Sequence, residues 1–223
     1  MELKGKIIDF LGDSITEGAG VSNLENRYDN RLAKSCELKA VYNYGIGGTR
    51  LAHQHTPSEK PRHDLCFCGR AYDLNRSADI VVVYGGVNDY IHGDAPIGQI
   101  GDTTPATFCG GVYFLMKLLQ TNFAGKTVVF MTPAHCCYNG VSDAVVSPRP
   151  MKHPSSMPLR GYVEIIKETG KLLGVPVLDL MENLGIDPNT PEDCANLTVD
   201  GLHFNDAGHE YIAKALEKFL KAL

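Results

Sequence analysis

The chain has 223 residues, of which 43% are hydrophobic, and this suits one α/β domain with a real core. The formal net charge is −5 without long blocks of one sign, which argues against a nucleic-acid partner. No apolar run approaches the roughly 20 residues of a membrane-spanning helix. We therefore expect a single domain over residues 1–223 with no membrane span.

The first residues and the cysteines indicate the compartment. Residues 1–14, MELKGKIIDFLGDS, have neither the apolar core nor the cleavage site of an export signal, so we predict a cytoplasmic protein. In that compartment the seven cysteines are expected to be free thiols. Cys66-x-Cys68 and the Cys136–Cys137 pair lack zinc-ligand spacing, and we expect neither a metal nor a cofactor. His135 beside Cys136 is the remaining metal alternative.

Short apolar runs alternate with helical patterns along the chain. The runs DIVVVYGG and KTVVFMTP are rich in β-branched residues, which is typical of strands buried on both faces. The predicted strands are Lys6–Leu11, Ala40–Tyr44, Ile80–Tyr84, Thr127–Met131 and Pro176–Leu178.

Three helices are predicted between and after these strands. Thr104-Pro105 is a good pair of cap and first helical residue, opening a helix through Leu119. A second helix is expected over Ser155–Leu173, and the last one follows Asn205 as its cap. Strands alternating with helices predict a parallel, doubly wound sheet.

Glycine-rich and polar stretches follow the strands. GDS (12–14) ends the first strand, NYGIGGTR (43–50) the second, and GGVND (85–89) the third, while DGLH (200–203) precedes the last helix. In a doubly wound sheet all four converge on one crevice.

The residue types in these stretches suit nucleophilic catalysis. Ser14 needs a base to take its proton, and His203 has the right chemistry for that base. Asp200 is able to fold back on the imidazole and hold its tautomer. The Asn88 amide and the backbone N–H groups of Gly48 and Ser14 are candidate oxyanion donors.

Each stretch also has an ordinary interpretation as a turn or a helix cap. GIGGTR resembles a dinucleotide-binding loop, but Arg50 stands where G-x-G-x-x-G requires its last glycine. The G-x-S-x-G elbow of the common α/β-hydrolases does not occur.

Taken together and in this order, the four stretches resemble the SGNH hydrolases, also called GDSL-type esterases and lipases. GDSIT resembles the nucleophile block, NYGIGG the glycine block, GGVND the asparagine block and DGLHFNDAGH the last block. In this resemblance the catalytic and oxyanion residues are Ser14, Gly48 (rather than Gly45 or Gly47), Asn88, Asp200 and His203.

The resemblance implies a flavodoxin-like three-layer α/β/α fold around a central parallel five-stranded sheet. It also implies metal-free ester hydrolysis in a shallow, open site. Phe204 departs from the family, which often has proline at this position, and the departure concerns loop geometry rather than chemistry.

Several neighbouring residues are secondary candidates. Asp13 is interpreted as holding its turn through backbone N–H groups, with substrate binding as an alternative; Asp89 is expected to act similarly. His92 and His135 follow strand ends and are candidate substrate contacts. His209 is interpreted as a surface or packing residue.

We predict a serine esterase that acts on short acyl groups, most simply acetyl, carried by a polar alcohol such as a carbohydrate. The loops 53–64 and 92–104 are polar and unsuited to lining an acyl-chain groove. Alternatives are a thioesterase or lysophospholipase on the same scaffold, or a flavodoxin-like binding module without catalysis. The sequence leaves the oligomeric state open.

Overall fold

A parallel sheet with strand order β2-β1-β3-β4-β7 forms the centre of the computed structural model, which describes residues 1–146 and 155–223. Its strands are β1 (Ile7–Gly12), β2 (Ala40–Gly45), β3 (Ile80–Tyr84), β4 (Thr127–Met131) and β7 (Val177–Leu178). The predicted five-stranded parallel sheet is confirmed. Two strands have the predicted bounds, and the other three differ by single residues at their ends.

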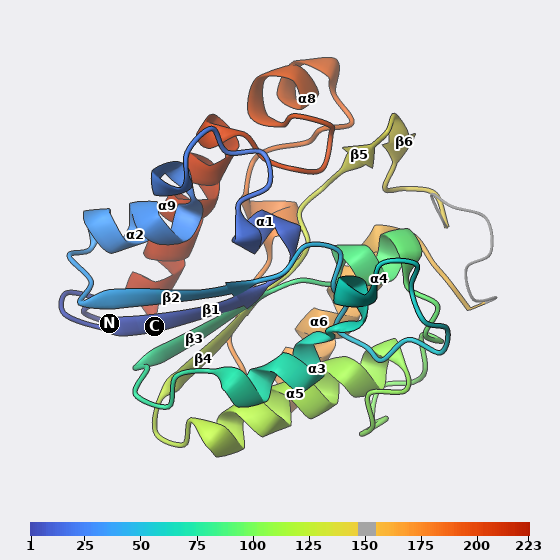
Figure 1. Ribbon diagram of the computed structural model, residues 1–223, viewed down its shortest axis with the longest axis horizontal. Helices are drawn as coiled ribbons and strands as arrows, with labels where there is room; N and C mark the ends of the chain where they lie inside the picture. Colours follow the sequence, from blue (N-terminus) through green and yellow to red (C-terminus); the bar gives the residue numbers. More distant parts are fainter. Residues whose placement is uncertain (147–154) are drawn as a thin grey trace.

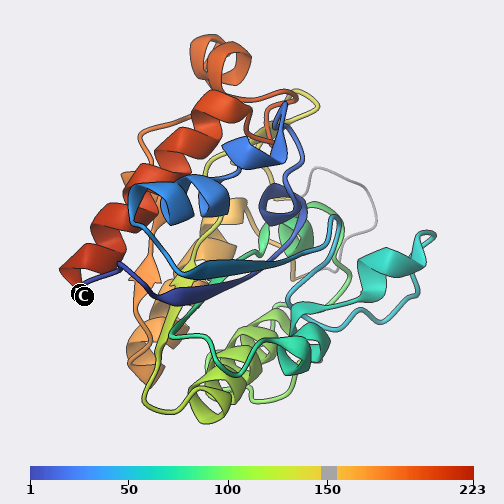
Figure 2. The same ribbon diagram turned by 60° about the vertical axis from the view of Figure 1, so that its left-hand side comes forward.

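Helices cover both faces of this sheet, which confirms the predicted three layers. Figures 1 and 2 show α2 and α9 on one face and α3, α5 and α6 on the other. The α-helices are α1 (Ser14–Glu17), α2 (Tyr28–Ser35), α3 (Phe67–Arg70), α4 (Val87–His92), α5 (Phe108–Asn122), α6 (Leu159–Leu173), α7 (Leu180–Asn183), α8 (Pro191–Leu197) and α9 (Asp206–Ala222). Short 3₁₀ helices are η1 (Leu24–Asn26), η2 (Pro61–Asp64) and η3 (Ala71–Asp73).

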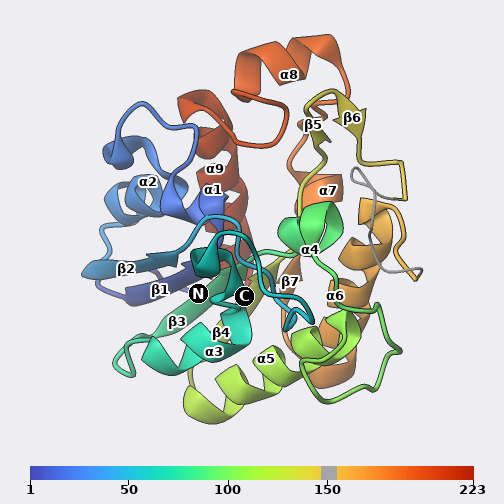
Figure 3. The same ribbon diagram turned by 45° about the vertical axis from the view of Figure 1, so that its right-hand side comes forward.

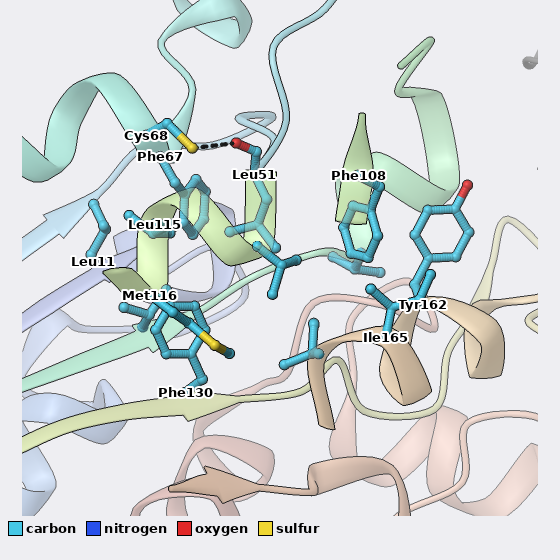
Figure 4. Packing of buried hydrophobic residues seen from close by; sticks show 14 of the residues in the cluster. Leu11, Leu51, Phe67, Cys68, Phe108, Leu115, Met116, Phe130, Tyr162 and Ile165 are labelled. Atoms are coloured by element: carbon cyan, nitrogen blue, oxygen red, sulfur yellow. Dashed lines mark hydrogen bonds between the residues drawn. The ribbon is translucent and has the colours of Figure 1, made fainter. Parts of the chain in front are cut away.

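The central strands are apolar on both faces because each face packs against helices. Along β1, Phe10 belongs to the core under α2 and α9, whereas Leu11 belongs to the core on the opposite face. Figure 4 shows the core on that opposite face, where Leu11 and Phe130 of the sheet lie with Leu115 and Met116 of α5. This double burial explains why the strands read as continuous apolar runs.

The predicted start of the first long helix, at Thr104-Pro105, is wrong. Helix α5 begins at Phe108, and its cap is Thr107, whose hydroxyl oxygen accepts from Gly110 N–H at 3.0 Å. The same hydroxyl donates to Asp102 at 2.8 Å, so the cap is itself held in place. Thr104 and Thr107 are both suitable cap residues, and the helix begins after Thr107, which also bonds to Asp102.

The second predicted helix starts four residues too early. Helix α6 begins at Leu159, because Pro158 has extended backbone angles (φ −53°, ψ 155°) and stands at the cap position. The last helix agrees with its prediction, since Asn205 accepts hydrogen bonds from the N–H groups of Ala207 and Gly208.

Two predictions from composition concern membranes and cysteines. Within the described ranges, no helix combines the length and the apolar character needed to cross a bilayer. All seven cysteines lie in these ranges and are free thiols.

Asp9 is a fully buried carboxyl group in the middle of β1. One of its oxygens accepts from Asn75 N–H at 2.7 Å, and the other has no partner in the described part of the chain. Burial raises the pKa of Asp9 from 3.8 to about 7. Between these values the folded protein keeps a proton that the unfolded chain releases, so the free energy of unfolding falls as pH rises.

We therefore expect Asp9→Asn to gain stability relative to the wild type between pH 5 and pH 8, by roughly 2 to 3 kcal/mol. Urea unfolding of both proteins at the two pH values measures this difference. The exposed Asp73→Asn serves as the control and should show no such trend. A stability difference between Asp9→Asn and wild type that does not change with pH would contradict this account of Asp9.

Candidate active site

Ser14, His203 and Asp200 form a hydrogen-bonded chain, although 189 residues separate the serine from the histidine. Ser14 Oγ lies 2.9 Å from His203 Nε2, and His203 Nδ1 lies 2.7 Å from Asp200 Oδ2. A carboxylate only accepts, so Nδ1 carries the proton and Nε2 is left as the acceptor for the serine hydroxyl. This tautomer is the one a general base requires.

The end of β1 explains how Ser14 is presented. A Cβ atom on Gly12 would lie 1.9 Å from the Thr16 side chain, so only glycine allows the chain to turn so tightly there. Asp13 then caps α1 by accepting from Ile15 N–H at 3.1 Å, and Ser14 becomes the first helical residue. Helix α1 and helix α4 lie beyond the same ends of the strands, as Figure 3 shows.

Asp200 is held firmly by the loop that it belongs to. Its Oδ1 accepts from the backbone N–H groups of Leu202 (3.1 Å) and His203 (2.8 Å), while Oδ2 binds the imidazole. Burial alone would raise the pKa of Asp200, but these hydrogen bonds outweigh it and the pKa lies below its ordinary value. The carboxylate is therefore ionised at neutral pH and suited to stabilise an imidazolium.

A small hairpin that the sequence did not predict supports this loop. Strands β5 (Cys137–Tyr138) and β6 (Val141–Ser142) pair with each other, and Cys137 N–H donates to Gly201 O at 2.8 Å. The Tyr138 ring stands edge-on to the His203 ring with centroids 6.4 Å apart. Two-residue strands are too short to produce a sequence pattern.

Of the three glycines considered as oxyanion donors, two have N–H groups that are already engaged. Gly45 N–H donates to Asn43 Oδ1 at 2.9 Å, and Gly47 N–H donates to Glu17 Oε2 at 2.7 Å. Gly48 N–H has no acceptor within residues 1–146 and 155–223. Gly48 has φ +78°, and a Cβ there would collide with the His63 ring at 2.3 Å, so glycine is required.

The Asn88 side-chain amide is held by two hydrogen-bond partners. Its Nδ2 donates to Thr49 O at 3.1 Å, and its Oδ1 lies 3.1 Å from His92 Nε2. An amide nitrogen has two protons, so the second is available to a ligand. The Ser14 N–H likewise has no acceptor among the described residues, and Ser14, Gly48 and Asn88 line the same cavity.

Two charged residues organise the glycine loop, and sequence reasoning missed their roles. Arg70 is buried; it donates to Tyr44 O, to Gly12 O at 3.0 Å and to Thr49 Oγ1 at 2.8 Å. Burial lowers the pKa of Arg70 to about 10, so the guanidinium remains charged at neutral pH. Glu17, which holds Gly47, also pairs with Arg62 at 2.6 Å.

The structure gives two of the secondary candidates partners away from the cavity. Asp13 is buried under α1, and burial raises its pKa to about 6 against the opposing Ile15 N–H hydrogen bond and the nearby His203. His135 Nδ1 binds Asp143 Oδ2 at 2.8 Å, and neither residue lines the cavity above Ser14. The described residues contain no group of three or more potential metal ligands around His135 or elsewhere.

Asp89 and His209 take structural positions, as predicted. Asp89 accepts from the backbone N–H groups of Leu51 (2.9 Å) and Ala52 (3.0 Å). His209 is fully buried, stacks on the Tyr28 ring and accepts from Tyr28 N–H at 3.2 Å.

A cavity of about 320 Å³ lies beside Ser14, and Gly48 and Asn88 also line it. His92 lines it, as the sequence suggested, together with His63 and Lys60 from the first polar loop. Residues 93–104 of the second polar loop are not among the residues that line it. The complete lining is Ser14, Gly48, Lys60, His63, Asn88, Ile91, His92, Tyr138, Leu202 and His203.

Comparison with known proteins gives the chain its family. The model of the GDSL-like lipase/acylhydrolase family matches residues 10–211. A solved structure from Lactobacillus plantarum is 31% identical, with 99% of this chain and 98% of that one covered and a TM-score of 0.82. No match was found among the curated proteins.

Two more distant solved structures share the fold. A protein from Chitinophaga pinensis described as a possible lipase is 19% identical, with 97% of this chain and 98% of that one covered and a TM-score of 0.69. The acetyl xylan esterase AlAXEase is 21% identical, with coverages of 95% and 98% and a TM-score of 0.63. The family match covers most of the chain and decides against a binding module without catalysis. This chain belongs to the GDSL-like lipase/acylhydrolase family and is a carboxylic ester hydrolase.

Proposed function

We propose that the protein hydrolyses esters through an acyl-enzyme on Ser14. His203 Nε2 takes the serine proton as Oγ attacks the ester carbonyl carbon. The carbonyl oxygen becomes an oxyanion, and the N–H groups of Ser14 and Gly48 and the Asn88 amide stabilise it. His203 then gives the proton to the leaving alcohol, and water repeats the cycle on the acyl group.

The observation that supports this proposal most strongly is the Ser14–His203–Asp200 chain, with distances of 2.9 and 2.7 Å, beside a cavity that Ser14, Gly48, Asn88 and His203 line together. The proposed nucleophile, base and orienting carboxylate are thus in hydrogen-bond contact with one another. In this proposal the N–H groups of Ser14 and Gly48 and the Asn88 amide receive the negative charge that develops on the attacked carbonyl, as acyl transfer requires.

The cavity also favours a short acyl group on a polar alcohol. Among its described lining residues only Ile91 and Leu202 are aliphatic, and they are 2% and 6% exposed. An acyl chain gains about 0.8 kcal/mol for each buried CH₂, and these two side chains offer little surface for that. Lys60, His63 and Tyr138 instead present groups that hydrogen-bond to hydroxyls. We therefore propose acetyl esters of a polar alcohol, such as a carbohydrate, as substrates.

We expect kcat/KM on p-nitrophenyl esters to be highest for acetyl and to fall as the acyl chain lengthens. Acetylated sugars should be hydrolysed as well, whereas matched thioesters and lysophospholipids should be poorer substrates. The Ser14→Ala protein, assayed in parallel, supplies the background rate to subtract. An optimum at eight carbons or more would overturn the acetyl proposal, and a preference for thioesters would favour the thioesterase alternative.

A further inference from the structure

Behind the Asn88 amide, a row of polar side chains leads away from the cavity into the protein. Asn88 Oδ1 lies 3.1 Å from His92 Nε2, and His92 Nδ1 lies 3.1 Å from a terminal guanidinium nitrogen of Arg50. Asn88 and His92 are one helical turn apart on α4, whereas Arg50 follows the glycine loop. The row therefore joins two of the segments that supply oxyanion donors.

The chemistry of these groups decides the direction of each hydrogen bond. A guanidinium only donates, so His92 Nδ1 accepts and the ring proton is on Nε2. That proton is donated to Asn88, and the atom facing it must therefore be the amide oxygen. The Asn88 nitrogen consequently lies on the side of Thr49 O, away from His92, and its second N–H is the donor that the proposed oxyanion hole requires.

The Arg50 guanidinium, at the far end of this row, is held in place by several hydrogen bonds. It is 3% exposed, and one guanidinium nitrogen donates to Asp64 Oδ1 (2.7 Å), Ser58 Oγ (2.8 Å) and His63 O (3.1 Å). These partners belong to the first polar loop, so the loop that lines the cavity also fixes the cation.

We propose that His92 is a positioning residue for the oxyanion-hole amide of Asn88, and that Arg50 holds His92 in the tautomer and place required. The proposal rests on the proposed function, in which Asn88 stabilises the oxyanion. The terminal torsion of an asparagine side chain is broad, so without His92 the amide would sample other orientations. The row also polarises the amide, because each donated hydrogen bond strengthens the next donor along it.

The prediction concerns kcat rather than KM, since a better-oriented donor acts on charge that exists only in the transition state. Asn88→Ala should lower kcat about 10²- to 10³-fold, as expected for loss of one oxyanion donor. His92→Leu should lower kcat by part of that, about 10- to 100-fold, with KM changed less than about threefold. His92→Gln, whose amide donates to Asn88 Oδ1 and accepts from Arg50, should recover most of the activity.

A double-mutant cycle on p-nitrophenyl acetate separates positioning from other roles of His92. If His92 acts through Asn88, His92→Leu should change kcat less than about twofold in the Asn88→Ala background. His92→Asn is a second disconnecting variant, because its shorter amide reaches Arg50 but not Asn88, and it covers the case in which the leucine variant fails to fold. His53→Leu, an exposed histidine outside this cavity, is the matched control and should be silent.

An equal loss in both backgrounds, or no rescue by glutamine, would overturn the positioning role and make His92 a substrate contact or a packing residue. Full activity of Asn88→Ala itself would instead remove Asn88 from the oxyanion hole. That outcome would overturn the proposed function at this residue together with the inference built on it. The two failures are therefore distinguishable in a single set of assays.

Discussion

Ser14→Ala should lower kcat on p-nitrophenyl acetate by about 10⁴-fold or more while leaving the fold unchanged. The hydroxyl is the group 2.9 Å from His203 Nε2, and its removal leaves the base without a nucleophile to activate. The change is small in volume, and the backbone N–H of residue 14 remains in place. Any residual rate should come from the oxyanion donors and substrate binding alone.

Steady-state kinetics and thermal unfolding of the same preparation measure this expectation. Ser77→Ala, which removes an exposed hydroxyl from the loop before β3, is the matched control and should keep wild-type activity. A Ser14→Ala protein with more than a few per cent of wild-type activity would show that another group is the nucleophile.

The second large effect is expected at Asp200 and His203. His203→Ala should cost nearly as much as loss of Ser14, because the nucleophile then has no base. Asp200→Asn should cost about 10²- to 10⁴-fold. An asparagine oxygen is able to keep accepting from the N–H groups of Leu202 and His203, but its nitrogen would face His203 Nδ1. The ring proton would move to Nε2, where it blocks proton removal from Ser14.

Comparison of kcat between Asp200→Asn and Asp200→Ala tests the tautomer argument. Both variants lack the carboxylate, but only the asparagine variant has an amide donor that would leave the ring proton on Nε2. If the asparagine variant were as active as the wild type, Asp200 would have no part in orienting the base.

The strands of the sheet were predictable because strands that are buried on both faces have continuous apolar sequences. Val81, Val82 and Val83 form a continuous β-branched run that has few other interpretations. Helix starts were less predictable, since Thr104 and Thr107 both look like caps and only the contact between Thr107 and Asp102 decides. That contact depends on tertiary structure.

The residues proposed for catalysis were found because their chemistry stands in short motifs at strand ends. The residues that hold them were missed: Arg70, Glu17 and Arg50 act through carbonyls, N–H groups and rings distant in the chain. No local spacing identifies such partners. His135 was misleading for the same reason, because it follows a strand end but turns to Asp143 rather than to the cavity.

Labelling with a fluorophosphonate tests whether Ser14, just after β1, is the nucleophile. We expect one phosphonyl adduct, found by peptide mass spectrometry on Ser14, with activity lost in proportion to labelling. We also expect that Ser14→Ala is not labelled and that His203→Ala is labelled more slowly than the wild type. An adduct on a different residue, or an active enzyme that is neither labelled nor inhibited, would contradict this assignment.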